Sequence, residues 1–312
     1  MKPHLIALFT VFVWGMTFVS TKVLLGVMSP LWILLIRFAL GFLALCALRP
    51  RLLRTEQRSH ELLFIGAGTT GIAAYYLLEN VALVHATATA VGVIVAAAPL
   101  FTAILSALSG DRSALTVRFF AGFTLAMAGL VMVGASAGGT GAFAFGAEDL
   151  LGDGLALLAA LVWAVYSLLV QRIAQLGYET IASTKRTFIW GLAFIVPATF
   201  LFGGSAPAAE ACLQPSIVAN LLFLGLVASA ACFVTWGVAV KELGPAISTT
   251  YIYLVPAITA IASILILGEP LSAPIICGLS LTITGLLLSQ KRVNPSNPMS
   301  SAAGGKYGQG EG

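Results

Sequence analysis

The stretch YIYLVPAITAIASILILGEP, residues 251–270, is apolar over a length that can cross a lipid bilayer, yet it contains a proline at position 256. Proline has no backbone N–H and weakens the preceding turn of a helix. Lipid offers no replacement partner for the carbonyl groups that such a break releases. The proline is therefore unexpected in a simple membrane span, and an earlier segment of the chain indicates why it is there.

Residues 94–113, IVAAAPLFTAILSALSGDRS, follow the same pattern with a proline at position 99. Other features recur at nearly the same separation: LFIG at 63–66 corresponds to LFLG at 222–225. A matched pair of prolines favours a shared role for Pro99 and Pro256 in bending or gating, whereas one proline alone would indicate a packing kink. The carbonyl groups released by the two breaks are expected near Val95 and Ile252.

Composition assigns the chain to the membrane proteins. Of the 312 residues, 59% are hydrophobic and 9% are charged, while soluble domains carry about 25% charged residues. Ten apolar segments are each of a length that suits a membrane span. The predicted spans are 4–26, 30–48, 62–84, 87–108, 114–135, 152–171, 188–203, 216–239, 246–267 and 272–290. The predicted fold is an all-α polytopic membrane protein.

The repeat divides these ten spans into two five-helix halves, residues 1–135 and 151–290. An outer linker is expected at 136–150, and the polar 291–312 tail is expected to be disordered. Because five is an odd number, the second half enters the membrane from the opposite side. Such inverted repeats are typical of secondary transporters, whose binding sites lie at broken helices in matching positions.

Charge predicts the orientation. With the amino terminus in the cytoplasm, 14 of the 16 Lys and Arg residues fall on inner segments, as the positive-inside rule requires. Both termini are therefore expected to be cytoplasmic. The net charge of +4 reflects this topology, and no nucleic-acid partner is predicted.

A carrier needs a polar, partly aromatic cavity near the middle of the membrane. Aromatic and polar side chains at helical spacing within the spans supply the candidates. The expected substrate-binding residues are Trp14, Thr17, Tyr76, Glu79, Asn80, Trp163, Tyr166, Trp236, Thr249 and Tyr253. The alternative for Trp and Tyr is an interfacial belt at the membrane surface.

Two charges within the spans are functional candidates, Arg37 and Glu79. Together with Lys22 they are predicted at similar outer depth, so an ion pair among the three is expected, either structural or as a substrate contact. For Lys22 the favoured interpretation is an extended side chain that reaches the outer interface. Few further acids or histidines lie within the spans, so proton coupling has little support and facilitated export fits equally well.

Enzyme motifs and cofactor motifs are not supported. GAGTTG at 66–71 matches a dinucleotide-binding pattern but lies within an apolar helix, and GASAG at 134–138 matches a hydrolase pattern without a strand or partner histidine. No spacing typical of metal ligands occurs. The chain is predicted to be no enzyme and to use no cofactor or metal.

Two segments, ENVALVHATATAVGVIVAAAPLFTAILSALSGD and WGVAVKELGPAISTTYIYLVPAITAIASILILGEPLS, resemble the two EamA-type repeats of the drug/metabolite transporter superfamily. The second repeat fits best, through Leu243-Gly244-Pro245, Pro256 and Gly268-Glu269-Pro270. The first departs from the pattern, because Asp111 stands where Glu is usual. Among these families the chain looks most like bacterial inner-membrane exporters of amino acids, aromatic ones included.

The resemblance implies a secondary transporter that exports small metabolites, most consistently amino acids, by alternating access. The alternatives are a channel-like facilitator, an exporter of other small amphipathic compounds, and a scaffold that transports nothing. The expected partners are a small-molecule substrate and the lipid bilayer. Gly-rich spans five and ten could pack against each other or against a second subunit, so both a monomer and a homodimer stay open.

Overall fold

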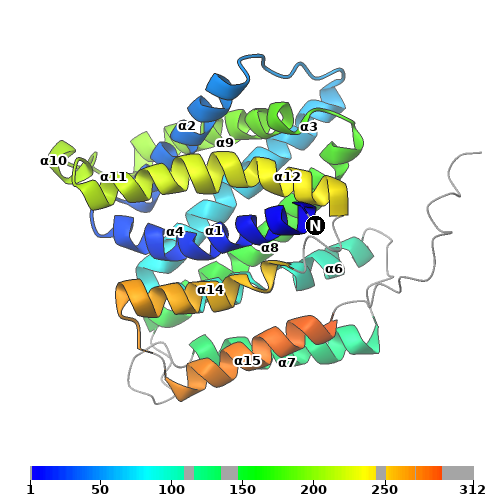
Figure 1. Cartoon of the computed structure of the whole chain (residues 1–312), viewed down its shortest axis with the longest axis vertical. Helices are drawn as coiled ribbons and strands as arrows, with labels where there is room; N and C mark the ends of the chain where they lie inside the picture. The colour runs from blue at the N-terminus through cyan, green and yellow to red at the C-terminus, as the bar shows by residue number, and fades with distance from the viewer. Residues whose placement is uncertain (1, 109–115, 135–146, 244–250, 271, 290–312) are drawn as a thin grey trace, which may run out of the picture.

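The structure is a computed structural model that describes residues 2–108, 116–134, 147–243, 251–270 and 272–289 (Figure 1). Within these ranges the chain is helical with short connections and no strand. The elements, with η marking π-helical segments, are α1 (Lys2–Leu25), α2 (Pro30–Leu48), α3 (Arg58–Ala67), η1 (Gly68–Ala74), α4 (Tyr75–His85), α5 (Ala88–Val95), α6 (Ala98–Leu108), α7 (Val117–Gly134), α8 (Ala147–Gln175), α9 (Thr180–Phe202), α10 (Ala209–Cys212), α11 (Pro215–Leu222), η2 (Phe223–Ala231), α12 (Cys232–Leu243), α14 (Val255–Ala262), η3 (Ser263–Leu267) and α15 (Ala273–Ser289).

Seven helical runs in the described chain are long and apolar enough to cross a membrane, and three further apolar helices are shorter. The seven are Lys2–Leu25, Pro30–Leu48, Arg58–His85, Ala88–Leu108, Leu150–Gln175, Thr180–Phe202 and Pro215–Leu243. The three are Val117–Gly129, Val255–Leu267 and Ala273–Gly285. They correspond one to one with the predicted spans, which confirms the all-α polytopic membrane fold.

The prediction was wrong about the start of the seventh span. Helix α9 begins at Thr180, eight residues before the predicted position 188. The sequence interpretation placed the basic residues Lys185 and Arg186 in an inner loop, but both lie within the helix. Lys185 is fully buried and donates to the carbonyl oxygens of Arg49 and Arg51. A cation whose hydrogen bonds are all accepted by protein groups can lie inside a helix bundle. The position of the charged residues was therefore a poor guide to the start of this helix.

The predicted linker 136–150 overlaps the structure at one end, because α8 already begins at Ala147. Residues 136–146 and the 291–312 tail lie outside the described residues. The expectations about them are therefore untested.

The fourth and ninth spans are interrupted in the same way. Helix α5 ends at Val95, Ala96 and Ala97 form a turn, and α6 begins at Ala98. In the ninth span the turn falls immediately before α14. Equivalent hydrogen bonds close the two turns, from Ala97 N to Ile94 O and from Leu254 N to Tyr251 O, each at 3.0 Å.

The two prolines each occupy the second residue of a new helical segment, Pro99 in α6 and Pro256 in α14. At such a position the backbone N–H would have no partner in the helix, so proline is well tolerated. The prolines therefore begin a second half-helix after each break.

The third and eighth spans share another irregularity, because each contains a π-helical segment near its middle, η1 and η2. A π-turn is wider than an α-turn and changes which side chains share a face. These segments also pack across the two halves of the chain: α9 lies against η1, and α2 lies against η2. A Cβ added to Gly41 in α2 would lie 3.1 Å from the carbonyl oxygen of Gly225 in η2.

The fifth and tenth spans, α7 and α15, lie side by side at one edge of the molecule (Figure 1). A Cβ on Gly129 would lie 2.5 Å from the carbonyl oxygen of Gly278, and a Cβ on Gly285 would lie 2.5 Å from that of Gly122. In the sequence repeat, Gly129 corresponds to Gly285 and Gly122 corresponds to Gly278. Each of the two contacts is therefore the counterpart of the other, and the interface is self-complementary. Within this chain, spans five and ten pack against each other.

Candidate functional site

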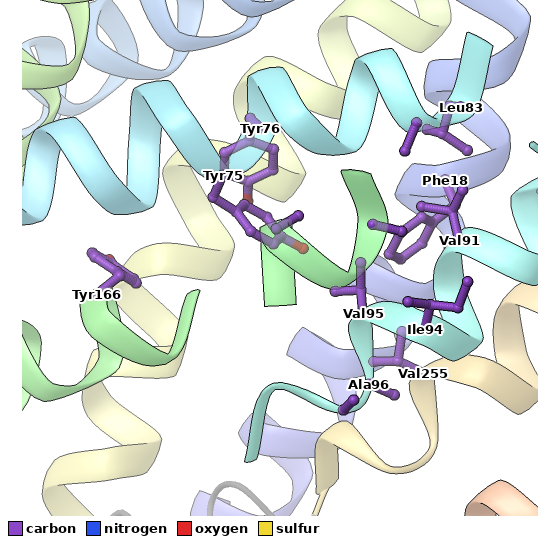
Figure 2. Packing of buried hydrophobic residues seen from close by; sticks show 14 of the residues in the cluster. Phe18, Tyr75, Tyr76, Leu83, Val91, Ile94, Val95, Ala96, Tyr166 and Val255 are labelled. Atoms are coloured by element: carbon purple, nitrogen blue, oxygen red, sulfur yellow. The ribbon is translucent and has the colours of Figure 1, made fainter. Parts of the chain in front are cut away.

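A small, partly open cavity lies where the two broken spans meet the first, third and sixth spans. Its volume is about 50 Å³. Figure 2 shows Phe18 of α1, Tyr75 and Tyr76 of α4, Val95 and Ala96 at the end of α5, and Val255 of α14 around this region. The lining residues are Trp14, Thr17, Phe18, Tyr75, Tyr76, Glu79, Val95, Ala96, Ala98, Trp163, Ile252 and Val255.

Both helix breaks contribute to the wall of this cavity. Val95 and Ala96 lie at the end of α5, and Ala98 is the first residue of α6. Ile252 and Val255 flank the other break in the same way. The backbone near Val95 and Ile252, where the sequence places the released carbonyl groups, therefore lies at the cavity. Backbone that leaves helical geometry within a membrane protein is tolerated where it borders such a cavity.

Aromatic rings form a continuous series along one side of the cavity. The ring centroids of Trp14 and Trp163 are 5.9 Å apart and nearly perpendicular. Tyr75 lies 4.6 Å from Trp163, and Tyr76 lies 4.7 Å from Tyr75. Tilted and edge-to-face pairs of this kind hold one another in place, and aromatic rings can stack on or contact a ligand with their edges.

Glu79 is the acidic residue of the cavity wall. Its side chain is 1% exposed, and its Oε1 atom accepts no hydrogen bond. The groups that act on the carboxylate are the Tyr75 hydroxyl, one turn earlier on α4, and the Arg37 guanidinium. A buried carboxylate with an unsatisfied oxygen is costly, so this group has capacity for a further donor.

Arg37 is fully buried in α2 and does not line the cavity. Its Nε donates to Ser229 Oγ at 3.2 Å, and its guanidinium carbon lies 4.3 Å from the centre of the Tyr76 ring. This cation–π contact joins Arg37 to the ring of Tyr76, which does line the cavity.

The expected ion pair among Lys22, Arg37 and Glu79 is absent. The ion pairs of the described residues are Arg49–Glu179 and Arg186–Glu61. Lys22 is committed elsewhere, because its ammonium group donates to the carbonyl oxygens of Leu83 and Ala86. Lys22 therefore caps the carboxyl end of α4, where a cation is favourable, and the reach of its side chain to the outer interface stays a prediction.

Glu269 completes the structure of the same turn between α4 and α5. Its two carboxylate oxygens accept hydrogen bonds from Ala88 N at 2.8 Å, Thr89 N at 3.2 Å and Thr89 Oγ1 at 2.8 Å. This is the acidic residue of the Gly-Glu pair after span nine, and it caps the amino end of α5 in the other half of the chain. A carboxylate suits that position because the first backbone N–H groups of a helix have no partner within it.

Of the ten expected substrate-binding residues, five line the cavity: Trp14, Thr17, Tyr76, Glu79 and Trp163. Tyr166 and Trp236 contact that wall from outside, with their rings 4.9 Å from Trp163 and 5.1 Å from Trp14 respectively. Tyr253 is buried in the turn before α14. Thr249 lies outside the described residues.

Asn80 does not face the cavity. Its Nδ2 donates to the carbonyl oxygen of Pro30 at 3.2 Å, at the start of α2. Asn80 follows Glu79 directly, and consecutive residues of an α-helix point in different directions. The two residues therefore serve different parts of the molecule.

Sequence reasoning missed Phe18, Tyr75, Ala96, Ala98 and Val255 as lining residues. Phe18 follows Trp14 by four positions, so the spacing that selected Trp14 and Thr17 would also have selected it. Tyr75 precedes Glu79 by four positions on α4, so regular helical spacing from Glu79 would have selected it. The sequence interpretation counted from Tyr76 instead, the neighbouring residue, and therefore passed over Tyr75.

The fold and the cavity together define a class of protein: a polytopic helical membrane protein whose two sequence-related halves line a small aromatic cavity at paired helix breaks. The model of the EamA-like transporter family matches residues 1–135 and again residues 150–290. The chain therefore belongs to the EamA-like transporter family.

Similar proteins extend over nearly the whole chain. An "Uncharacterized transporter" of Archaeoglobus fulgidus is 28% identical over 290 residues, which is 92% of this chain and 97% of that protein. A "Probable terminal-alkyne amino-acid exporter" of Streptantibioticus cattleyicolor is 30% identical over 289 residues, 91% of each chain. A solved crystal structure with 21% sequence identity superposes with a TM-score of 0.66 over 93% of this chain and 98% of that one, and so shares the fold.

Proposed function

We propose that this protein exports small metabolites, amino acids including aromatic ones, across the inner membrane by alternating access. The observation that carries the proposal is the aromatic cavity at two symmetric helix breaks. The series of rings from Trp14 to Tyr76 suits stacking against an aromatic side chain. The relative from Streptantibioticus cattleyicolor is named as an amino-acid exporter, which supports this choice of substrate class.

The size of the cavity supports a carrier that changes shape. One enclosed water needs roughly 10–15 Å³ on this measure of volume, so a cavity of about 50 Å³ has room for a small group but not for a whole aromatic amino acid. Substrate entry must then displace rings or half-helices. The segments beside Ala97 and Leu254 suit such movement, because the helical hydrogen-bond ladder is already interrupted there.

The proposal includes two five-helix repeats, 1–135 and 151–290, inserted in opposite directions with both termini in the cytoplasm. The self-complementary contact between α7 and α15 and the matched breaks support this arrangement. In such a transporter the two halves move relative to each other around the cavity.

Exchange of labelled substrate in proteoliposomes tests the function. Vesicles loaded with unlabelled Phe, Trp, Thr or Met should accumulate the same labelled amino acid, and the initial rate should saturate with concentration. Uptake that never saturates, or unitary electrical currents, would instead support a channel. Absence of exchange for all four amino acids would contradict the proposed substrate class.

A further inference from the structure

We propose that Glu79 and the rings of Trp14, Tyr75, Tyr76 and Trp163 form a subsite for a protonated amino group, so that the substrate must carry an ammonium charge. This inference rests on the proposed transport function and specifies the substrate class of the same cavity. Its basis is the combination of an unsatisfied buried carboxylate and four aromatic rings in one small space.

The first step concerns the missing partner of Glu79. Its carboxylate is almost wholly buried and borders the cavity, and Oε1 accepts no hydrogen bond. A buried carboxylate is ordinarily paired with a cation or fully hydrogen-bonded. Neither nearby cation lies within ion-pair distance of it: Lys22 caps α4. Arg37 acts on the carboxylate only from a greater distance, while its Nε donates to Ser229 and its guanidinium packs on Tyr76.

The second step concerns the rings. Tyr75 and Glu79 are four residues apart on α4, so they lie on one face of that helix. Trp163 and Trp14 continue the aromatic wall from Tyr75, with centroid distances of 4.6 Å and 5.9 Å along the series. The faces of Trp and Tyr attract cations, most strongly where the cation is desolvated. A cation in the cavity therefore meets a carboxylate together with several ring faces.

The third step concerns selectivity. An ammonium group donates up to three hydrogen bonds and can satisfy Oε1, whereas a substrate carboxylate in the same place would face the Glu79 charge. A volume of about 50 Å³ accommodates an amino group and its first carbon atoms. Amines and zwitterionic amino acids are therefore accepted, and acids that lack an amino group are rejected.

The test compares ligands that share a phenyl ring and differ in charge. Purified full-length protein in detergent is titrated with 2-phenylethylamine, L-phenylalanine and 3-phenylpropanoate, and binding is followed by tryptophan fluorescence, since Trp14 and Trp163 line the cavity. We expect saturable signals from the two amino compounds and at least tenfold weaker binding of the acid. Equal or tighter binding of 3-phenylpropanoate, or no binding of either amino compound, would overturn the inference.

Substitutions at Glu79 test whether this carboxylate is the group that binds the amine. Glu79→Gln should weaken 2-phenylethylamine binding at least about tenfold, which corresponds to about 1.4 kcal/mol, and Glu79→Asp should restore part of it. Glu210→Gln removes an exposed carboxylate far from the cavity wall and should leave binding unchanged. Unaltered amine binding in a folded Glu79→Gln protein would contradict the subsite. The ligand comparison on the unmodified chain decides the matter if that variant does not fold.

The exchange assay and the binding assay, each applied to Glu79→Gln, distinguish this inference from the proposed function. Amino-acid exchange in proteoliposomes that is indifferent to Glu79→Gln would leave the transporter proposal standing and overturn the ammonium subsite. Binding of amines that depends on Glu79, without exchange of any amino acid, would support the subsite and contradict the proposed export of amino acids.

Discussion

Lys185 shows how a single charge can be built into a helix bundle. It is fully buried in α9, and its ammonium group donates to the carbonyl oxygens of Arg49 and Arg51, immediately after the end of α2. The last carbonyl groups of a helix and of its following turn need donors from outside the helix. Lys185 supplies them from the other half of the chain and so joins α2 to α9.

Replacing Lys185 with methionine should therefore lower stability. The change keeps an unbranched side chain but leaves two carbonyl oxygens without that donor, at a cost of about 1–3 kcal/mol. A fluorescence-based thermal melt of the detergent-solubilised protein measures the effect. Lys241→Met is the matched control, because Lys241 is exposed in α12 and its loss should leave the melting temperature unchanged. Equal melting of Lys185→Met and the unmodified protein would show that these hydrogen bonds contribute nothing.

At the scale of elements, the glycines of α7 and α15 set how closely two helices approach. The Cβ atoms of a Gly129 or Gly285 variant would collide with the backbone of the facing helix, and backbone cannot move aside as a flexible side chain can. Close contact of this kind is how helices associate in lipid, where apolar burial gives no advantage.

We expect Gly129→Leu to separate α7 from α15 and to destabilise the protein by about 1–3 kcal/mol or more. Gly154→Leu is the control, since a Cβ at Gly154 in α8 has no neighbour within 4 Å. Thermal melting and the yield of monodisperse protein on size-exclusion chromatography provide the measurements. Similar behaviour of both variants would mean that the α7–α15 contact does not contribute to stability.

The helix breaks lead to a prediction about rate. In the absence of Pro256, the ninth span could continue as one helix across the turn at Leu254, because alanine favours a helix interior by about 3 kcal/mol over proline. Pro256→Ala should therefore stiffen this half of the gate and reduce maximal exchange roughly tenfold, equivalent to about 1.4 kcal/mol in the barrier. The substrate concentration that gives half of the maximal exchange rate should change less than the maximal rate itself.

Pro197→Ala tests whether the effect is specific to the break. Pro197 lies inside the continuous helix α9, whose residues do not line the cavity, so its replacement should leave exchange close to normal. If both proline variants slow exchange equally, or if neither does, the break before Pro256 has no particular role in gating.

The sequence predicted the number of spans and the positions of the helix breaks better than it predicted the ends and the internal geometry of the helices. Apolar length identified the ten spans because the bilayer demands it, and the two prolines indicated the positions of the breaks because proline lacks an N–H. The start of α9 was not predictable from charge, since the partners of Lys185 are contributed by a distant loop. The π-helical segment η1, which packs against α9, was not predictable either, because no local pattern in the sequence distinguishes a π-turn from an α-turn.

For the whole molecule, the decisive property is that the most extensive helix contacts among the described residues join one half of the chain to the other. The pairs α1 with α12, α2 with η2, α4 with α8, α9 with η1, and α7 with α15 are all of this kind. Neither half therefore buries its apolar faces by itself, and a relative movement of the halves would alter the cavity between them. The sequence repeat indicated two related halves, but their interleaving became visible only in three dimensions.

This arrangement predicts opposite membrane sides for two corresponding corners of the chain. Position 109 follows α6, and Pro270 follows η3 at the equivalent corner of the second half. After replacement of the four native cysteines, Ser109→Cys should react with a membrane-impermeant thiol reagent only in permeabilised cells. Pro270→Cys should react in intact cells, as should Glu210→Cys, which serves as the control for the outer surface. Because the two positions follow corresponding spans of the repeat, equal accessibility from one side would require parallel halves. The reciprocal Gly129 and Gly285 contacts would then not reflect an inverted repeat, and alternating access around the cavity would lose its structural basis.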